Sequence, residues 1–378
     1  MKTIKDIQYF EGVKVLMHPD LNVPIENGIV TNDYRIRMAL PTIDFLCKRG
    51  AKVILIGHSE SSDGSNGTLL PVSNEYSKLG IANIFIENIR NANSVIENDL
   101  KNGGVAMLEN LRIVSEGEKK NDPKFAKELA SLADIYVNDA FSVCHRKHAS
   151  TVGVPKFLPS YAGFQLEREI LNLSKAFNAP HPFIFILGGA KFNTKLPLLQ
   201  KFMDKTDSIF VGGALAHDLF KFKGYEVGTS LVSDVPVDLG AIAVSPKLIL
   251  PIDVMTKDHR VKKSDALLST DCAYDAGPKT IEALKGKIAS AKFILWNGPV
   301  GMYEHGFTEG TEGIARMIAD QTSKGAETIV GGGDTLAAIA KLGIEDKYSF
   351  VSTGGGAMLD YLAQGTLPGI DALESSKE

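Results

Sequence analysis

The sequence predicts an α/β protein made of two Rossmann-like lobes, each a parallel sheet covered by helices. Short apolar segments that favour strands alternate with helical segments, a pattern typical of parallel sheets with helices on their faces. About a dozen such strands would make an unusually wide single sheet, which favours two sheets. The chain has 378 residues, enough for two domains with separate cores.

The N-terminal half contains short apolar strands and two clear helices. A glycine, Gly50, ends the first helix, and Pro123 lies at the start of the second, as is common at helix ends and starts. The predicted strands cover residues 13–18, 51–58, 82–88, 104–110 and 133–141, and the helices cover 36–50 and 122–133. Residues 59–67, rich in Ser, Gly and Asn, are predicted to form a loop.

A second set of strands begins near Phe183. Predicted strands cover residues 183–187, 208–212, 247–255, 292–298, 327–333 and 348–355, with a helix over 280–291. The segment 162–180 favours one helix that ends at Asn178 and Pro180. We therefore expect a first domain over 1–161, a connecting hinge helix over 162–178 and a second domain over 179–378, whose tail could return to the first. The alternative, a helix covering one large sheet, is disfavoured by the strand count.

Composition limits the classes of partner and compartment. The net charge of −4 gives no overall attraction to nucleic acid. No apolar run is long enough to span a bilayer, and the N-terminus does not resemble a signal peptide. The three cysteines are far apart in the sequence, which suits a reducing compartment. We expect a cytoplasmic protein that has neither nucleic-acid nor membrane partners.

Four glycine clusters in the C-terminal half each follow an apolar strand. Glycine allows a positive φ and a close approach of the backbone to a ligand, and a helix that begins there directs N–H groups outward. The clusters are Gly188-Gly189, Gly212-Gly213, Gly331-Gly332-Gly333 and Gly354-Gly355-Gly356. At the carboxyl ends of parallel strands they predict a phosphate or nucleotide site.

Polar and basic residues follow the strands of the first half in the same way. Because the carboxyl ends of parallel strands meet at one sheet edge, the basic members should face one crevice. Guanidinium groups bind phosphate and carboxylate through paired hydrogen bonds, so the crevice suits a small ligand that carries both groups. The residues are Asp20, Asn22, Arg35, His58, Arg112 and Arg146. His145 and His148 could suggest a metal, but no third ligand is evident nearby.

The second half offers groups suited to phosphoryl transfer. Lys191 and Lys195 place two ammonium groups over the first glycine turn, where they can balance charge on a moving phosphoryl group. Asp334 could orient nucleotide-bound Mg²⁺, with Thr335 on phosphate oxygens, although both could simply cap a helix. Glu304 could bind ribose hydroxyls. The sequence has no Walker-type phosphate loop.

These residues lie in motifs that, in order over nearly the whole chain, resemble those of phosphoglycerate kinase. The motifs are DLNVP (20–24), RIRMALPTI (35–43), LENLR (108–112), VNDAFSVCHRKHAS (137–150), LGGAKFNTK (187–195), YDAGPKT (274–280), WNGPVGMYE (296–304), GGGDT (331–335) and STGGGAMLDYL (352–362). The resemblance implies a monomeric kinase with hinge closure. Its implied reaction is reversible, Mg²⁺-dependent phosphoryl transfer from 1,3-bisphosphoglycerate to ADP, giving 3-phosphoglycerate and ATP.

The resemblance also assigns roles residue by residue. It implies direct in-line transfer, with Arg35, Lys191 and Lys195 as catalytic residues and Asp334 as the metal residue. The family's acid-substrate residues fall on Asp20, Asn22, Arg35, His58, Arg112 and Arg146. Its nucleotide residues fall on Gly189, Lys191, Lys195, Gly213, Asn297, Glu304, Gly332, Asp334 and Thr335.

Two motifs depart from the family pattern. His18 and Ser61 stand where the family has arginine, and Glu60 adds a negative charge to the basic patch. These changes should weaken binding of the acid substrate more than binding of the nucleotide. Two alternatives therefore remain open, namely a related kinase with an altered acid-substrate specificity and a non-catalytic nucleotide-binding homologue.

Overall fold

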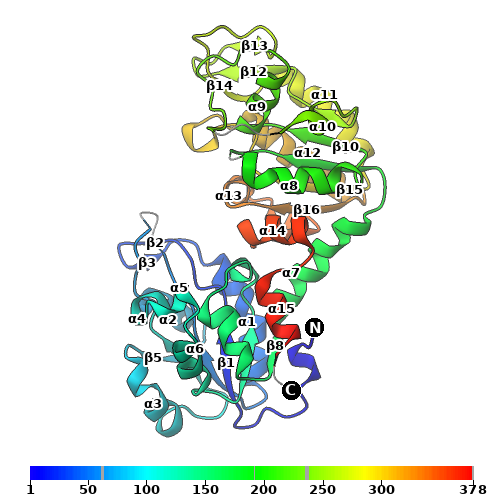
Figure 1. The fold of residues 1–378 in the computed structure, drawn as a ribbon. Coiled ribbons are helices and arrows are strands. Elements are labelled where there is room, and N and C mark those ends of the chain that lie inside the picture. Colours follow the sequence, from blue (N-terminus) through cyan, green and yellow to red (C-terminus); the bar gives the residue numbers. More distant parts are fainter. Residues whose placement is uncertain (61–63, 191, 235–237, 377–378) are drawn as a thin grey trace. The chain divides into compact units, whose positions relative to one another are not determined.

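The computed structural model describes residues 1–60, 64–190, 192–234 and 238–376. The chain divides into two compact units (Figure 1). Unit 1 comprises Met1–Leu171 and Thr366–Glu378, and unit 2 comprises Asn172–Gly365. Within the described residues each unit has one six-stranded parallel sheet, which confirms the predicted fold class.

The strands of unit 1 are short and apolar because both faces of a parallel sheet are covered. All four residues of the strand Val105–Leu108 are buried, for example. In sheet order the strands are β5 (Asn83–Ile86), β6 (Val105–Leu108), β4 (Lys52–Leu55), β1 (Lys14–His18), β7 (Ile135–Asn138) and β8 (Ser160–Ala162). A separate hairpin pairs β2 (Ile25–Glu26) with β3 (Ile29–Val30).

Helices cover this sheet, and most of them connect successive strands. Asp122 caps one of them, because its carboxylate accepts a hydrogen bond from the Lys124 backbone N–H, and Pro123 follows in the first turn. The helices are α1 (Tyr34–Cys47), α2 (Leu70–Lys78), α3 (Ala92–Asn98), α4 (Leu111–Val114), α5 (Gly117–Lys120), α6 (Pro123–Ala130) and α15 (Pro368–Glu374).

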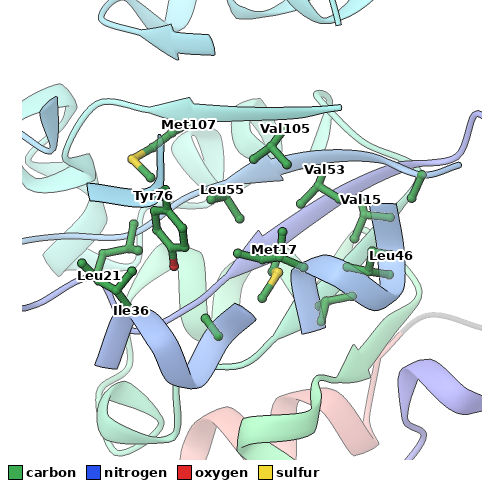
Figure 2. Close-up of a cluster of buried hydrophobic side chains, with 14 of the residues drawn as sticks. Val15, Met17, Leu21, Ile36, Leu46, Val53, Leu55, Tyr76, Val105 and Met107 are labelled. Carbon is green, nitrogen blue, oxygen red and sulfur yellow. The ribbon is translucent and has the colours of Figure 1, made fainter. Parts of the chain in front are cut away.

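Apolar side chains on one face of the sheet form the core of unit 1 (Figure 2). Val15 and Met17 of β1 are two residues apart, so both point to the same face. Helices α1 and α2 cover this face with Ile36, Leu46 and Tyr76. The core therefore fixes where the carboxyl ends of β1, β4 and β6 lie.

Unit 2 repeats this architecture and adds a small antiparallel sheet. The parallel strands are, in sheet order, β11 (Leu248–Ile249), β10 (Ser208–Val211), β9 (Phe183–Leu187), β15 (Phe293–Asn297), β16 (Glu327–Gly331) and β17 (Phe350–Ser352). The antiparallel strands are β13 (Val261–Lys263), β12 (Asp253–Thr256) and β14 (Ala273–Ala276). The helices are α8 (Phe192–Met203), α9 (Ala214–Phe222), α10 (Gly240–Ala243), α11 (Pro278–Ser290), α12 (Glu309–Ser323), α13 (Gly333–Lys341) and α14 (Gly356–Gln364).

Two predicted elements differ from the structure. The strand predicted over 247–255 is divided between β11 and β12, which belong to different sheets. The helix predicted from residue 162 begins later, as α7 (Phe164–Ser174), because Ser160–Ala162 pairs with β7, and a 3₁₀ turn over Lys175–Asn178 follows α7. The boundary between the two units falls within α7. Its role as a hinge stays a prediction.

The C-terminal helix α15 belongs to unit 1 although unit 2 precedes it in the chain. The Gly369 backbone N–H donates a hydrogen bond to the Cys144 carbonyl, 2.8 Å away. A side chain at residue 369 would lie 2.9 Å from the Cys144 Cα, so glycine permits this close contact. Among the described residues, no helix is both long and apolar enough to cross a membrane.

Candidate active site

The predicted acid-binding residues of unit 1 follow β1, β4, β6 and β7, which are neighbours in the sheet. Asp20 is held by two partners at the end of β1. Its carboxylate lies 3.1 Å from the Arg35 guanidinium and accepts a 2.6 Å hydrogen bond from the Ser142 hydroxyl. Arg35 also donates to the Asn22 carbonyl, 3.1 Å away. The structure therefore brings Asp20, Asn22 and Arg35 together, with Ser142 as a partner that the sequence did not indicate.

Arg112 is the most deeply buried cation of this group, with a side chain that is 1% exposed. Its Nη1 forms an ion pair with Glu60, and this hydrogen bond lowers the pKa of Glu60. Its Nε and Nη2 are buried and have no hydrogen-bond partner among the described residues. Buried donors of this kind are normally satisfied, which makes this edge of the guanidinium a candidate partner for a ligand oxygen.

Three histidines of this region are neutral at physiological pH. Burial, then the charge of Arg112, lowers the pKa of His58 to about 2 and that of His148 to about 4. Burial, then the nearby His148, lowers the pKa of His18 to about 3. Histidine at position 18 therefore supplies a hydrogen-bonding group and no positive charge.

The remaining positive charge of this region comes from Arg146 and Lys119. Both act electrostatically on His148 and on Glu60. Lys119 lies on α5. Because it does not follow a strand in the sequence, it could not be predicted to belong to this region. We define the anion subsite as Arg112, Arg146, Lys119, His18, His58 and His148.

Unit 2 has a cavity of about 510 Å³ that several predicted nucleotide residues line. Its glycine turns pack backbone against backbone. Gly213 has a φ of +62°, and a Cβ there would lie 2.8 Å from the Gly189 nitrogen. Gly298 has a φ of +91°, and a Cβ there would lie 2.4 Å from the Gly188 oxygen. The predicted residues that line the cavity are Gly189, Gly213, Glu304 and Asp334.

Lys195 lies on α8, and its Nζ donates a 2.5 Å hydrogen bond to the Gly188 carbonyl of the first glycine turn. Burial lowers the pKa of Lys195 to about 8, and the charge of Asp334 opposes this shift. The ammonium is therefore close to the groups that would hold phosphate. Lys191, predicted beside it, lies outside the described residues.

Asn297, Gly332 and Thr335 are not among the residues that line the cavity. They join the turns around it, since the Thr335 hydroxyl accepts a 2.9 Å hydrogen bond from the Gly298 N–H. Gly332 has a φ of +100°, and a Cβ there would lie 3.2 Å from Asn297 Nδ2. These contacts fix the start of α13 against the end of β15.

The exposed carboxylate of Asp334 lies in the first turn of α13 and lines the cavity. One accessible carboxylate fits Mg²⁺ bound to a nucleotide, because this ion keeps several waters and takes other ligands from phosphates. Asp275 also lines the cavity, a position that the sequence did not indicate. Burial raises its pKa to about 7, against hydrogen bonds from the Gly310 and Ala276 N–H groups.

Comparison with known proteins shows similarity over nearly the whole chain. Residues 4–365 match the family model of phosphoglycerate kinase. The phosphoglycerate kinase of Thermosipho africanus (strain TCF52B) is 44% identical over 400 residues, covering 100% of this chain and 98% of that protein. The phosphoglycerate kinase of Dictyoglomus turgidum (strain DSM 6724 / Z-1310) is 41% identical over 399 residues, covering 99% of each chain.

Solved structures give the same result. The phosphoglycerate kinase from Coxiella burnetii is 35% identical, with a TM-score of 0.84 and 99% of each chain covered. The enzyme from Pyrococcus horikoshii OT3 is 31% identical, with a TM-score of 0.86, covering 99% of this chain and 98% of that chain. In sequence and in fold, the chain belongs to the phosphoglycerate kinase family.

Proposed function

We propose how the residues of this chain carry out phosphoglycerate kinase activity, which the full-length family match assigns to it. Unit 1 binds 3-phosphoglycerate or 1,3-bisphosphoglycerate, and unit 2 binds ATP or ADP with Mg²⁺. The observation that carries the acid-binding half is the buried Nε and Nη2 edge of Arg112, which has no partner among the described residues. A phosphate oxygen pair matches that edge in geometry and in charge.

The nucleotide half of the proposal depends on the cavity in unit 2. Its volume of about 510 Å³ is within the range of small-molecule sites. Gly189 and Gly213 let backbone N–H groups approach phosphate oxygens, and Glu304 provides a carboxylate for ribose hydroxyls. Asp334 would hold Mg²⁺, which when bound offsets negative charge on the nucleotide phosphates.

The transfer step needs no protein nucleophile. A carboxylate oxygen of 3-phosphoglycerate attacks the γ-phosphorus of ATP, the bond from that phosphorus to the bridging oxygen breaks, and ADP leaves with the electron pair. Arg35 and Lys195 balance the charge on the transferred group, and Lys191 is assigned the same role from the sequence motif. The reverse reaction forms ATP from 1,3-bisphosphoglycerate.

A coupled assay that measures ADP formation from MgATP tests this assignment. Turnover is expected to depend on 3-phosphoglycerate and to disappear when a chelator removes Mg²⁺. Binding of MgADP without turnover on 3-phosphoglycerate, but with turnover on another acid, would replace the proposed substrate by an altered one. MgADP binding without turnover on any acid would favour the non-catalytic reading.

The value of kcat/KM for MgATP should fall as the pH rises above about 8. The lowered pKa of Lys195, about 8, means that its ammonium is charged below this pH and loses its proton above it. Ionisations of the free enzyme appear in kcat/KM, so the loss should approach tenfold per pH unit. Lys195→Arg should extend the plateau, because the guanidinium pKa is above about 12. A wild-type profile that stays flat to about pH 9.5 would contradict the prediction, because it would mean that deprotonation of Lys195 near pH 8 does not limit kcat/KM.

A further inference from the structure

The backbone around Glu60 is tied to two other segments of unit 1. The Glu60 N–H donates a 2.9 Å hydrogen bond to Asn22 Oδ1, and Glu60 forms a β-bridge with Asn66. Asn110 Nδ2 donates to the carbonyls of Ser59 and Gly67, 2.7 and 2.6 Å away. Both ends of the loop after β4 are therefore fixed beside α4, which carries Arg112. These contacts hold the Glu60 backbone in place, so that its side chain is positioned on Arg112. A surface residue in an ordinary ion pair has no such constraint.

Glu60 shares a single guanidinium with the expected ligand. Its carboxylate occupies Nη1 of Arg112, while the buried Nε and Nη2 edge has no partner among the described residues. An anion on that edge would lie roughly 5 Å from the Glu60 carboxylate, since both would contact the same planar group. Like charges this close repel each other, and a doubly charged anion is repelled about twice as much as a singly charged one.

The positive charges of the anion subsite outweigh this repulsion, but Glu60 lowers the net charge that a ligand meets. Its three histidines are neutral at physiological pH, so Arg112, Arg146 and Lys119 supply its positive charge. Glu60 then cancels one of these three charges. The side chain of Glu60 is 31% exposed, so solvent screens its effect but does not remove it.

We propose that Glu60 is a specificity-determining residue of the anion subsite, holding Arg112 by Nη1 and weakening the binding of a doubly charged phosphate more than that of a singly charged group. The subsite thus prefers a dianionic phosphate over a singly charged distal group less strongly than it would with a neutral residue at position 60. This inference rests on the proposed function, because it takes Arg112 as part of the acid-substrate site.

Glu60→Gln tests the proposal, because glutamine keeps an oxygen that can accept from Arg112 and loses the charge. At pH 7.5 the phosphate of 3-phosphoglycerate is mostly dianionic. The KM for 3-phosphoglycerate should fall about tenfold, while the KM for MgATP stays within twofold. Binding of the 3-sulfate ester of glycerate, which has the same shape and one charge fewer on the distal group, should improve by about threefold.

Glu97→Gln is the matched control. Glu97 forms an exposed ion pair with Lys14 at the amino end of β1, the opposite sheet edge from the site, so both KM values should stay unchanged. An unchanged or raised KM for 3-phosphoglycerate in Glu60→Gln, with a wild-type melting temperature, would overturn the proposal. If Glu60→Gln improves the binding of 3-phosphoglycerate and of the sulfate ester by the same factor, the effect does not depend on ligand charge, and the proposal is wrong.

Titration calorimetry separates this inference from the proposed function. If neither wild type nor Glu60→Gln turns over 3-phosphoglycerate, the assigned acid substrate is wrong. The inference about Glu60 then depends on the dissociation constant of 3-phosphoglycerate. A roughly tenfold decrease in Glu60→Gln supports it, and an unchanged value refutes it.

Discussion

Lys195→Ala is expected to lower kcat by roughly a hundredfold to a thousandfold. The Lys195 ammonium lies against the first glycine turn, 2.5 Å from the Gly188 carbonyl, and one pre-positioned charge on a transferring group is commonly worth about 3–4 kcal/mol. The KM for MgATP should change far less, because this charge acts mainly in the transition state. Steady-state kinetics with saturating 3-phosphoglycerate measures both constants.

Lys201→Ala is the control for this experiment. Lys201 is also on α8, and its ammonium donates to the Ala363 carbonyl, 3.0 Å away, so its removal also breaks an ammonium-to-carbonyl contact. Lys201 does not line the nucleotide cavity, and its variant should keep nearly full turnover. If the two variants lose the same activity, the loss comes from the helix, and Lys195 has no catalytic role.

Trp296→Ala is expected to lower the free energy of unfolding by about 3–5 kcal/mol. Trp296 lies in β15, between β9 and β16, and is fully buried in the core of unit 2. Its indole N–H also donates a 2.9 Å hydrogen bond to the Gly298 carbonyl, in the turn beside the nucleotide cavity. The substitution should therefore weaken nucleotide binding as well.

Trp296→Phe separates packing from the hydrogen bond, since phenylalanine fills most of the volume and lacks the N–H. Trp296→Phe should lower the free energy of unfolding clearly less than Trp296→Ala does. Circular dichroism is the suitable probe, because the chain has one tryptophan and both variants remove its fluorescence. Phe222→Ala, at a side chain that is 52% exposed, should have little effect. If Trp296→Ala lowers the free energy of unfolding by less than about 1 kcal/mol, the prediction is wrong, and the core around residue 296 must collapse onto the smaller side chain.

The parallel sheets could be predicted because their strands are buried on both faces and are therefore continuously apolar. Val261–Lys263 was missed for the opposite reason, since two of its three residues are exposed and two are lysines. The division of the strand predicted over 247–255 is explained by Pro251, which cannot donate a ladder hydrogen bond. Local pattern thus identified the buried strands and missed an exposed one, even though that strand pairs with β12 only a few residues away.

The same limit applies to the site. Asp20, His58 and Arg112 could be predicted because they directly follow apolar strands, and strand ends converge in a parallel sheet. The pairing of Glu60 with Arg112 could not be predicted, because it depends on how Asn22 and Asn110 hold a loop. The neutrality of His18 likewise follows from burial, which the sequence around it does not reveal.

The return of α15 to unit 1 sets an order in which the protein can mature during translation. All residues of unit 2 have been synthesised once Gly365 is added to the chain. Unit 1 still lacks Thr366–Glu378 at that point. Leu367, Ile370 and Leu373 are buried in the finished structure, so the surface that they cover stays open until they emerge from the ribosome. The half of the protein that is synthesised first is thus the half that is completed last.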